Sequence, residues 1–179
     1  MNKVYSHSYC NISASAAEDG SQGLCFPRDP RDLHVVEVDL CVRDLKSEVD
    51  FDVEHTRCRI VNRHFWVQNV TESVLNTRAW VLQEGLLSPR VLHFGCNQLL
   101  WECREWEAAE SYPNGIPTIM SSNPDGAMKH KYCYNANWRE IVSTYSMTSL
   151  TFASDKLVAV SALAKQMKDS LNDEYIVGL

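Results

Sequence analysis

Two side chains four residues apart could act together on a ligand. Trp80 and Glu84 lie in an apolar segment with helical spacing, and four residues are about one helical turn, so the indole and the carboxylate share a face. In the more ordinary arrangement Glu84 pairs with Arg78 or Arg90, and Trp80 packs on a neighbouring element. The spacing leaves both arrangements open.

Three other polar residues accompany this pair. The guanidinium of Arg78 could fork onto phosphate oxygens, but a position in the first helical turn is also typical of a surface ion pair. We expect structural roles for the other two: Gln83 hydrogen-bonds to backbone at the helix–strand corner, and Arg90 anchors a carboxylate at the sheet edge. Arg78 is therefore the candidate ligand-binding residue.

The sequence offers weak nucleophile candidates. Cys103 has no base that the sequence brings to its thiol, since His93 is expected on an alternating strand position, so we interpret it as a packed cysteine. The Ser-Asp-Lys run at 154–156 precedes an apolar helical stripe and is primarily a helix cap. The seven cysteines have irregular spacing and no Cys-x-x-Cys pair, which predicts reduced, mostly buried thiols and no metal site.

The helix that carries Trp80 and Glu84 is predicted over residues 76–87. Asn76 is a plausible N-cap, and the Ser-Pro pair at 88–89 predicts its end. Residues 90–94 and 99–103 then flank a turn-forming tetrapeptide, which predicts a β-hairpin. We expect four of its apolar side chains to stack against the helix: Leu92, Phe94, Leu99 and Trp101.

The remaining elements follow from shorter patterns. A helix end and a strand are expected before residue 18, a loop over 18–31, and strands over 36–40 and 64–70. Residues 105–128 are rich in charge, Pro and Asn-Gly, which predicts a long surface loop or lid. Two apolar stripes, over 138–145 and 157–171, predict C-terminal helices, the second capped near Ser154 and Asp155.

Composition restricts the class of protein. The 179 residues are 45% hydrophobic, enough for one domain with a buried core. The formal net charge of -6 and the scattered Lys and Arg residues argue against a nucleic-acid surface. No segment has the length of a membrane span or the apolar core of a signal peptide. We expect a cytoplasmic protein whose partners are proteins or small molecules.

Residues 78–90 read Arg-Ala-Trp-Val-Leu-Gln-Glu-Gly-Leu-Leu-Ser-Pro-Arg. This block resembles the Arg-x-Trp-x-x-Gln-Glu-x-x-Leu-Ser-x-Arg motif of the fungal heterokaryon-incompatibility (HET) domain. Residues 4–6, 12–14, 101–103, 138–145, 150–151 and 154–157 agree with the same family in order. The resemblance covers essentially the whole chain and implies self/nonself recognition with regulated cell death signalling.

HET domains have been likened to the TIR fold, some of whose members hydrolyse NAD with a Glu that follows a Trp by four positions. The resemblance therefore implies an α/β fold: a partial TIR-like (flavodoxin-like) sheet with flanking helices, a β-hairpin and C-terminal helices. It assigns Glu84 and Trp80 as catalytic and NAD as substrate. A carboxylate would stabilise the oxocarbenium-like ribose, and the cationic nicotinamide leaves without a metal or cofactor.

Two departures from the family set the expected boundaries. HET domains usually begin with a Leu-Ser-Tyr-x-Trp-Gly strand and continue to a Trp-Ile-Asp-x-Leu-Cys-Ile-x-Gln segment, and neither is in this sequence. We therefore expect the C-terminal part of the domain over 1–104, a loop and helical extension over 105–179, and a chain cut at both ends. A non-catalytic module that works by self-association, or an inactive remnant, are the alternatives.

Overall fold

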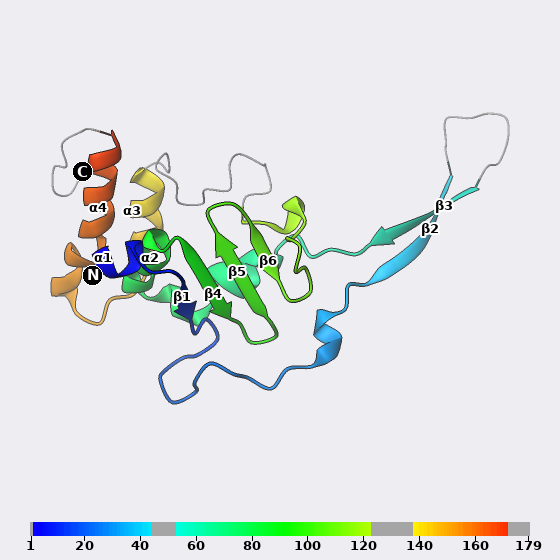
Figure 1. The fold of residues 1–179 in the computed structure, drawn as a ribbon, viewed down its shortest axis with the longest axis horizontal. Helices are drawn as coiled ribbons and strands as arrows, with labels where there is room; N and C mark the ends of the chain where they lie inside the picture. The colour runs from blue at the N-terminus through cyan, green and yellow to red at the C-terminus, as the bar shows by residue number, and fades with distance from the viewer. Residues whose placement is uncertain (1, 44–52, 123–137, 172–179) are drawn as a thin grey trace.

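The computed structural model describes residues 2–43, 53–122 and 138–171, which form a mixed α/β protein (Figure 1). Its main sheet has the strand order β1-β4-β5-β6. Strand β1 (Asn11–Ser13) runs parallel to β4 (Arg90–Phe94), while β5 (Leu99–Cys103) and β6 (Glu107–Ala109) continue the sheet with antiparallel pairing. The α/β class predicted from the sequence is confirmed.

Helices gather at the β1 end of this sheet (Figure 1). They are α1 (Asn2–Ser6), α2 (Ala79–Leu87), α3 (Trp138–Ser146) and α4 (Val158–Leu171). Their shared core contains seven buried residues: Ala79, Leu87, Ile141, Tyr145, Ala159, Val160 and Leu163. Both predicted C-terminal helices are confirmed, although the Ser-Asp pair at 154–155 lies one turn earlier, in the 3-10 turn η5 (Ala153–Asp155).

A second core lies against the sheet, around Trp66, which has no exposed surface. The prediction of a strand over 64–70 was wrong. The chain turns helical there and passes into the π-helical segment η2 (Val67–Thr71). Asn62 starts this turn, because its side-chain oxygen accepts from the His64 N–H at 2.9 Å and its carbonyl accepts from the Phe65 N–H. Burial of Phe65, Trp66 and Val70 outweighs their β propensity.

Helix α2 begins three residues later than predicted. Residues Val74–Thr77 form the 3-10 turn η3, and Asn76 does not cap α2: its amide donates to the Val70 carbonyl at 2.6 Å. Arg78 holds the N-cap position without a side-chain cap. The predicted end is confirmed, because Ser88 is the C-cap and its hydroxyl donates to the Glu84 carbonyl at 2.7 Å.

The predicted hairpin is confirmed as β4 and β5, but its faces are reversed. Val91, His93 and Leu100 are buried, and Val91 and His93 line a cavity together with residues of α2. The four side chains predicted to stack on the helix alternate with these three along the strands, and each is half-buried.

The predicted long loop over 105–128 was wrong for its first part. Residues 107–109 form β6, and residues Thr118–Met120 form the 3-10 turn η4. Glu107 is buried, and its carboxylate accepts from the Ser121 hydroxyl at 2.7 Å and the Ser122 N–H at 3.1 Å. These bonds fold the segment back onto the sheet. Residues 123–128 lie outside the described residues.

A two-stranded ribbon extends away from the main sheet (Figure 1). It pairs β2 (Glu37–Arg43) with β3 (Val53–Arg59) in antiparallel register. The strand predicted at 36–40 is therefore confirmed, and its partner is the strand at 53–59. The loop predicted over 18–31 is irregular up to the short turn η1 (Pro30–Leu33). Among the described helices, none is long and apolar enough to cross a membrane.

Candidate functional site

A small cavity lies between α2 and the β1, β4 and β5 strands. Its polar lining includes Asn11, Ser13, Glu84, His93 and Glu102, and the rest of the lining is largely aliphatic. The cavity volume is about 90 Å³, room for a few water molecules. Strands β1 and β4 place Ser13 opposite His93 in register, so side chains far apart in the sequence meet at this point.

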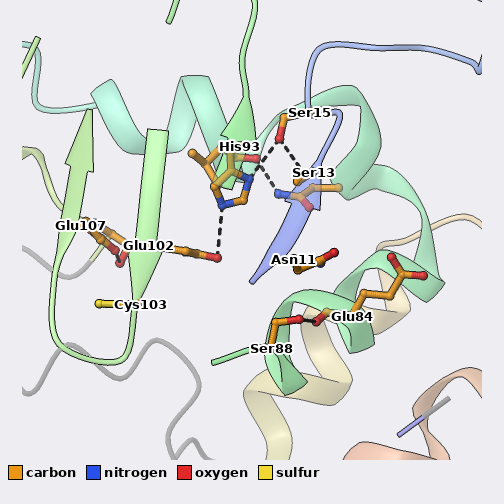
Figure 2. A network of polar contacts seen from close by, with 12 residues as sticks. Asn11, Ser13, Ser15, Glu84, Ser88, His93, Glu102, Cys103 and Glu107 are labelled. Atoms are coloured by element: carbon orange, nitrogen blue, oxygen red, sulfur yellow. Dashed lines mark hydrogen bonds and ion pairs between the residues drawn. The ribbon is translucent and has the colours of Figure 1, made fainter. Parts of the chain in front are cut away.

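His93 is the centre of a buried polar network (Figure 2). Its Nδ1 lies 3.0 Å from the Ser15 hydroxyl, which in turn lies 2.9 Å from the Ser13 hydroxyl. Its Nε2 lies 3.3 Å from Glu102 Oε1, but no hydrogen bond to that nitrogen has favourable geometry. The edge of the ring meets Trp66, with centroids 6.2 Å apart.

The network has the composition of a proton relay: two hydroxyls, an imidazole and a carboxylate. An imidazole between a hydroxyl and a carboxylate can hold or pass a proton at either nitrogen. Ser15 is only 1% exposed, so its hydroxyl cannot meet a substrate directly. The arrangement can therefore fix the position of the His93 ring in the cavity wall, but it does not present a nucleophile.

Glu84 lines the same cavity from α2 and is half-buried. In Figure 2 its side chain extends away from the His93 ring. No ion pair joins Glu84 to either Arg78 or Arg90 among the described salt bridges. The partner of Glu84 is Tyr5. Burial raises the pKa of Tyr5 to about 12, and the hydrogen bond to Glu84 and the negative charge of Glu84 are further causes. The carboxylate is thus held by a neutral phenol.

Trp80 lines a different pocket from Glu84. It lines a separate hollow with Lys3, Gln83 and Lys165 and packs against the helical core. The helical spacing places Trp80 and Glu84 on neighbouring parts of the helix surface, but Trp80 is not among the residues that line the cavity containing Glu84. The structure does not bring the two side chains into one pocket.

The other motif residues have contacts that differ from those expected. Arg78 is exposed and its backbone forms a bridge with Ser149. Arg90 donates to the Tyr9 carbonyl at 3.3 Å and lies 5.1 Å above the Tyr9 ring, so the expected carboxylate partner was wrong. Gln83 is 2% exposed, and its side-chain oxygen lacks the expected hydrogen bond.

The cysteines were predicted to be mostly buried, and this was wrong. Six are described as free thiols, of which Cys25, Cys41 and Cys96 are exposed and the others half-buried. Cys103 donates to the Trp106 carbonyl at 3.5 Å and lies opposite Arg90 rather than His93 in the strand register. Within the described ranges, no cluster of three or more His, Cys, Asp or Glu residues could hold a metal ion.

Sequence reasoning missed Ser15 and Glu102 and left His93 without a role. Ser15 and His93 are 78 positions apart, and no local spacing connects them. The available signal was a His in an otherwise apolar strand run, together with a Glu on the adjacent predicted strand, which alternation would place on the same face.

Comparison with known proteins identifies the segment that contains the candidate motif. Residues 1–84 match the family described as heterokaryon incompatibility protein (HET). This segment belongs to the HET family. The match supports a heterokaryon incompatibility-type function. The HET segment includes Arg78, Trp80 and Glu84, while His93 and Glu102 follow it in the sequence.

No curated protein and no solved structure shows significant similarity to the chain. The assignment of the HET segment therefore rests on the family match alone. The site consists of a carboxylate from α2 on one wall of a small cavity and the His93 network on the opposite strands.

Proposed function

We propose that this chain acts in the cytoplasm in fungal self/nonself recognition and triggers regulated cell death, and that it does so by hydrolysing NAD at Glu84. The observation that carries the proposal is the position of Glu84. It is a half-buried carboxylate, within the HET segment, on the wall of a cavity. It is not neutralised by either arginine of its motif, so its charge is available to a ligand.

A TIR-like arrangement is part of this proposal. Strands β1 and β4 are parallel neighbours, and the chain between them includes α2, as in the crossover units of flavodoxin-like sheets. Glu84 of α2 lines the same cavity as the three residues of β1. The antiparallel strands β5 and β6 extend the sheet beyond that unit.

The proposed reaction breaks the bond between the nicotinamide nitrogen and C1′ of the ribose. The bonding electrons leave with nicotinamide, a water oxygen bonds to C1′, and the water releases one proton. Positive charge develops on the ribose as the bond breaks, and the Glu84 carboxylate stabilises it electrostatically. The reaction consumes only NAD and water, and needs no metal or cofactor.

The proposal assigns the neighbouring motif residues different roles. Trp80 supports the site by packing α2 against the helical core, and Tyr5 holds the Glu84 carboxylate from α1. Arg78 is exposed at the start of α2, where its guanidinium could bind a diphosphate oxygen from solvent.

The test is incubation of the purified chain with NAD, with nicotinamide release followed by chromatography. We expect release by the wild type and a loss of at least 100-fold in Glu84→Gln, by analogy with the roughly 10²–10³-fold effect of removing one electrostatic group. Glu140→Gln is the matched control, because Glu140 is an exposed glutamate on helix α3. Equal release by wild type and Glu84→Gln would refute catalysis by Glu84.

The cavity volume favours a second candidate, a non-catalytic interaction module in the same recognition process. At about 90 Å³ the cavity is smaller than ligand pockets, which are typically about 300–1,000 Å³, and NAD must widen it. The same assay distinguishes the candidates. A folded wild-type chain that releases no nicotinamide but self-associates would favour the interaction module.

A further inference from the structure

The two faces of the β2–β3 ribbon differ in chemistry. On one face, Glu37 and Asp39 of β2 lie opposite Arg59 and Arg57 of β3, with Nε–oxygen distances of 3.0 and 3.1 Å. The alternate positions are mostly apolar, and Val36, Leu40 and Ile60 are 56%, 47% and 60% exposed. The ribbon is thus an amphipathic sheet of two strands with an uncovered apolar face.

Both long edges of this ribbon are open. In the described part of the chain, β2 and β3 pair only with each other. The Ile60 N–H donates to the Val36 carbonyl. The backbone hydrogen bonds between β2 and β3 are therefore made by the pairs of even-numbered residues. The free backbone groups therefore belong to odd-numbered residues, including Asp39 on one edge and Arg57 on the other.

Residues 36–41 and 55–60 of the ribbon contain no Pro and no Lys, two residue types that natural edge strands often use against pairing. An isolated two-stranded ribbon is also marginally stable in water, and a third strand with a shared apolar face stabilises it.

The charges determine which edge of a second copy fits. The β2 edge carries carboxylates and the β3 edge carries guanidinium groups. Pairing two β2 edges would place carboxylates opposite carboxylates, and pairing two β3 edges would place arginines opposite arginines, both of which are destabilising. Pairing β2 of one copy with β3 of the next places Asp39 of the first copy opposite an arginine of the second, as it already faces Arg57 within its own ribbon.

The ion pairs in the ribbon leave room for this second partner. Asp39 and Arg57 side chains remain 65% and 70% exposed while paired. In an extended sheet each row of carboxylates would lie between two rows of arginines. The apolar side chains of adjacent copies would meet on the other face and lose contact with water.

We propose that the β2–β3 ribbon is a self-association surface, and that copies of this chain join head to tail by antiparallel pairing of β2 with β3 of the next copy. Such a heterologous contact does not close on itself in a dimer and continues to larger species. This inference concerns assembly and is independent of NAD hydrolysis at Glu84.

The first measurement is sedimentation velocity of the full chain over a concentration series. We expect species larger than a dimer at high concentration, and fewer of them at high salt, because exposed ion pairs are screened. A monomer at every concentration, or a mass that stops at the dimer, would overturn the proposal.

Charge reversal on each edge tests the pairing itself. We expect Asp39→Arg and Arg57→Asp each to lose the larger species alone, and a 1:1 mixture to regain them, because each reversed edge then meets a complementary one. Undiminished assembly of the single variants, or a mixture that stays monomeric, would contradict the pairing of β2 with β3.

Circular dichroism of each variant checks folding, since both changes also remove the ion pair within the ribbon. If either reversal prevents folding, Asp39→Asn and Arg57→Gln remove the charge without reversing it. We expect these folded variants to assemble only at higher concentration than the wild type. Assembly equal to that of the wild type would refute the role of the charges.

Discussion

His93 is a buried polar residue, and its burial explains why its ring nitrogens face polar side chains. It is 4% exposed, and a polar ring in that position costs free energy unless its nitrogens find partners. Ser15 satisfies Nδ1, and Glu102 faces Nε2 at 3.3 Å. Ser13, at the end of β1, and Ser15, two residues later, thus connect the N-terminal segment to the hairpin through His93.

Removing the Ser15 hydroxyl tests this connection. Ser15→Ala leaves a buried imidazole nitrogen without a partner, which we expect to lower the free energy of unfolding by about 1–3 kcal/mol. Urea unfolding measures the change. Ser143→Ala, on the exposed side of α3, is expected to change stability by less than about 0.5 kcal/mol. Equal effects of the two changes would mean that the Ser15–His93 contact is not stabilising.

Tyr5 predicts a dependence of stability on alkaline pH. Its pKa is raised to about 12 by burial, with Glu84 as a further cause, whereas an unfolded tyrosine ionises near its ordinary value of 10. Between these values the unfolded state loses the proton first, so this contribution to stability is present below pH 10 and is lost as pH rises toward 12.

Tyr5→Phe is therefore expected to lose less stability than the wild type between pH 9 and pH 11, as measured by urea unfolding. Tyr145, whose pKa is also raised by burial and by Asp155, is present in both proteins and cancels in the comparison. Parallel pH profiles would show that the pKa of Tyr5 is not raised in the folded state.

At the scale of elements, the turn between β4 and β5 limits what residue can follow Phe94. A Cβ on Gly95 would lie 2.8 Å from the Gln98 carbonyl oxygen and 3.0 Å from Leu100 Cδ1. We expect Gly95→Ala to lower the melting temperature, with a loss of about 1–3 kcal/mol in unfolding free energy. Gly20→Ala is the control, because a Cβ there meets nothing within 4 Å. A neutral Gly95→Ala would show that the turn relaxes freely.

Elements with strong local signals were predictable from the sequence, and those decided by burial were not. The hairpin and the end of α2 follow from a turn tetrapeptide and a Ser-Pro pair. The segment at 64–70 has strand-forming residues but becomes helical, because Trp66 fills the second core and Asn62 starts a turn. Strand β6 pairs with β5, and the buried Glu107 accepts hydrogen bonds from Ser121 and Ser122, partners that the local sequence did not reveal.

The candidate site was predictable only on its helix side. Glu84 could be selected from its motif, and the structure places it on a cavity wall. The opposite wall depends on the parallel pairing of β1 with β4, a contact across about 80 positions that no local pattern specifies. Trp80 lies one turn from Glu84 on the same helix, but it packs against the helical core and lines a different pocket.

At the scale of the whole molecule, the two proposals, NAD hydrolysis and self-association, concern separate parts of the chain. The HET segment ends at Glu84, yet the cavity that contains Glu84 is completed by His93 and Glu102 beyond it. The site therefore needs the hairpin as well as the matched segment. The ribbon lies within the HET segment, extends away from the main sheet and the helices (Figure 1), and contributes no residue to the cavity lining. Substitutions in the ribbon are therefore expected to impair the proposed assembly without affecting the proposed NAD hydrolysis.

The most direct test of the proposed function is induced expression of the chain in a filamentous fungus, with cell death scored by uptake of a vital dye. We predict death on expression of the wild type and of Glu140→Gln, and survival with Glu84→Gln at equal protein levels. Survival with the wild type, or equal death with Glu84→Gln, would contradict a cell-death function that depends on Glu84.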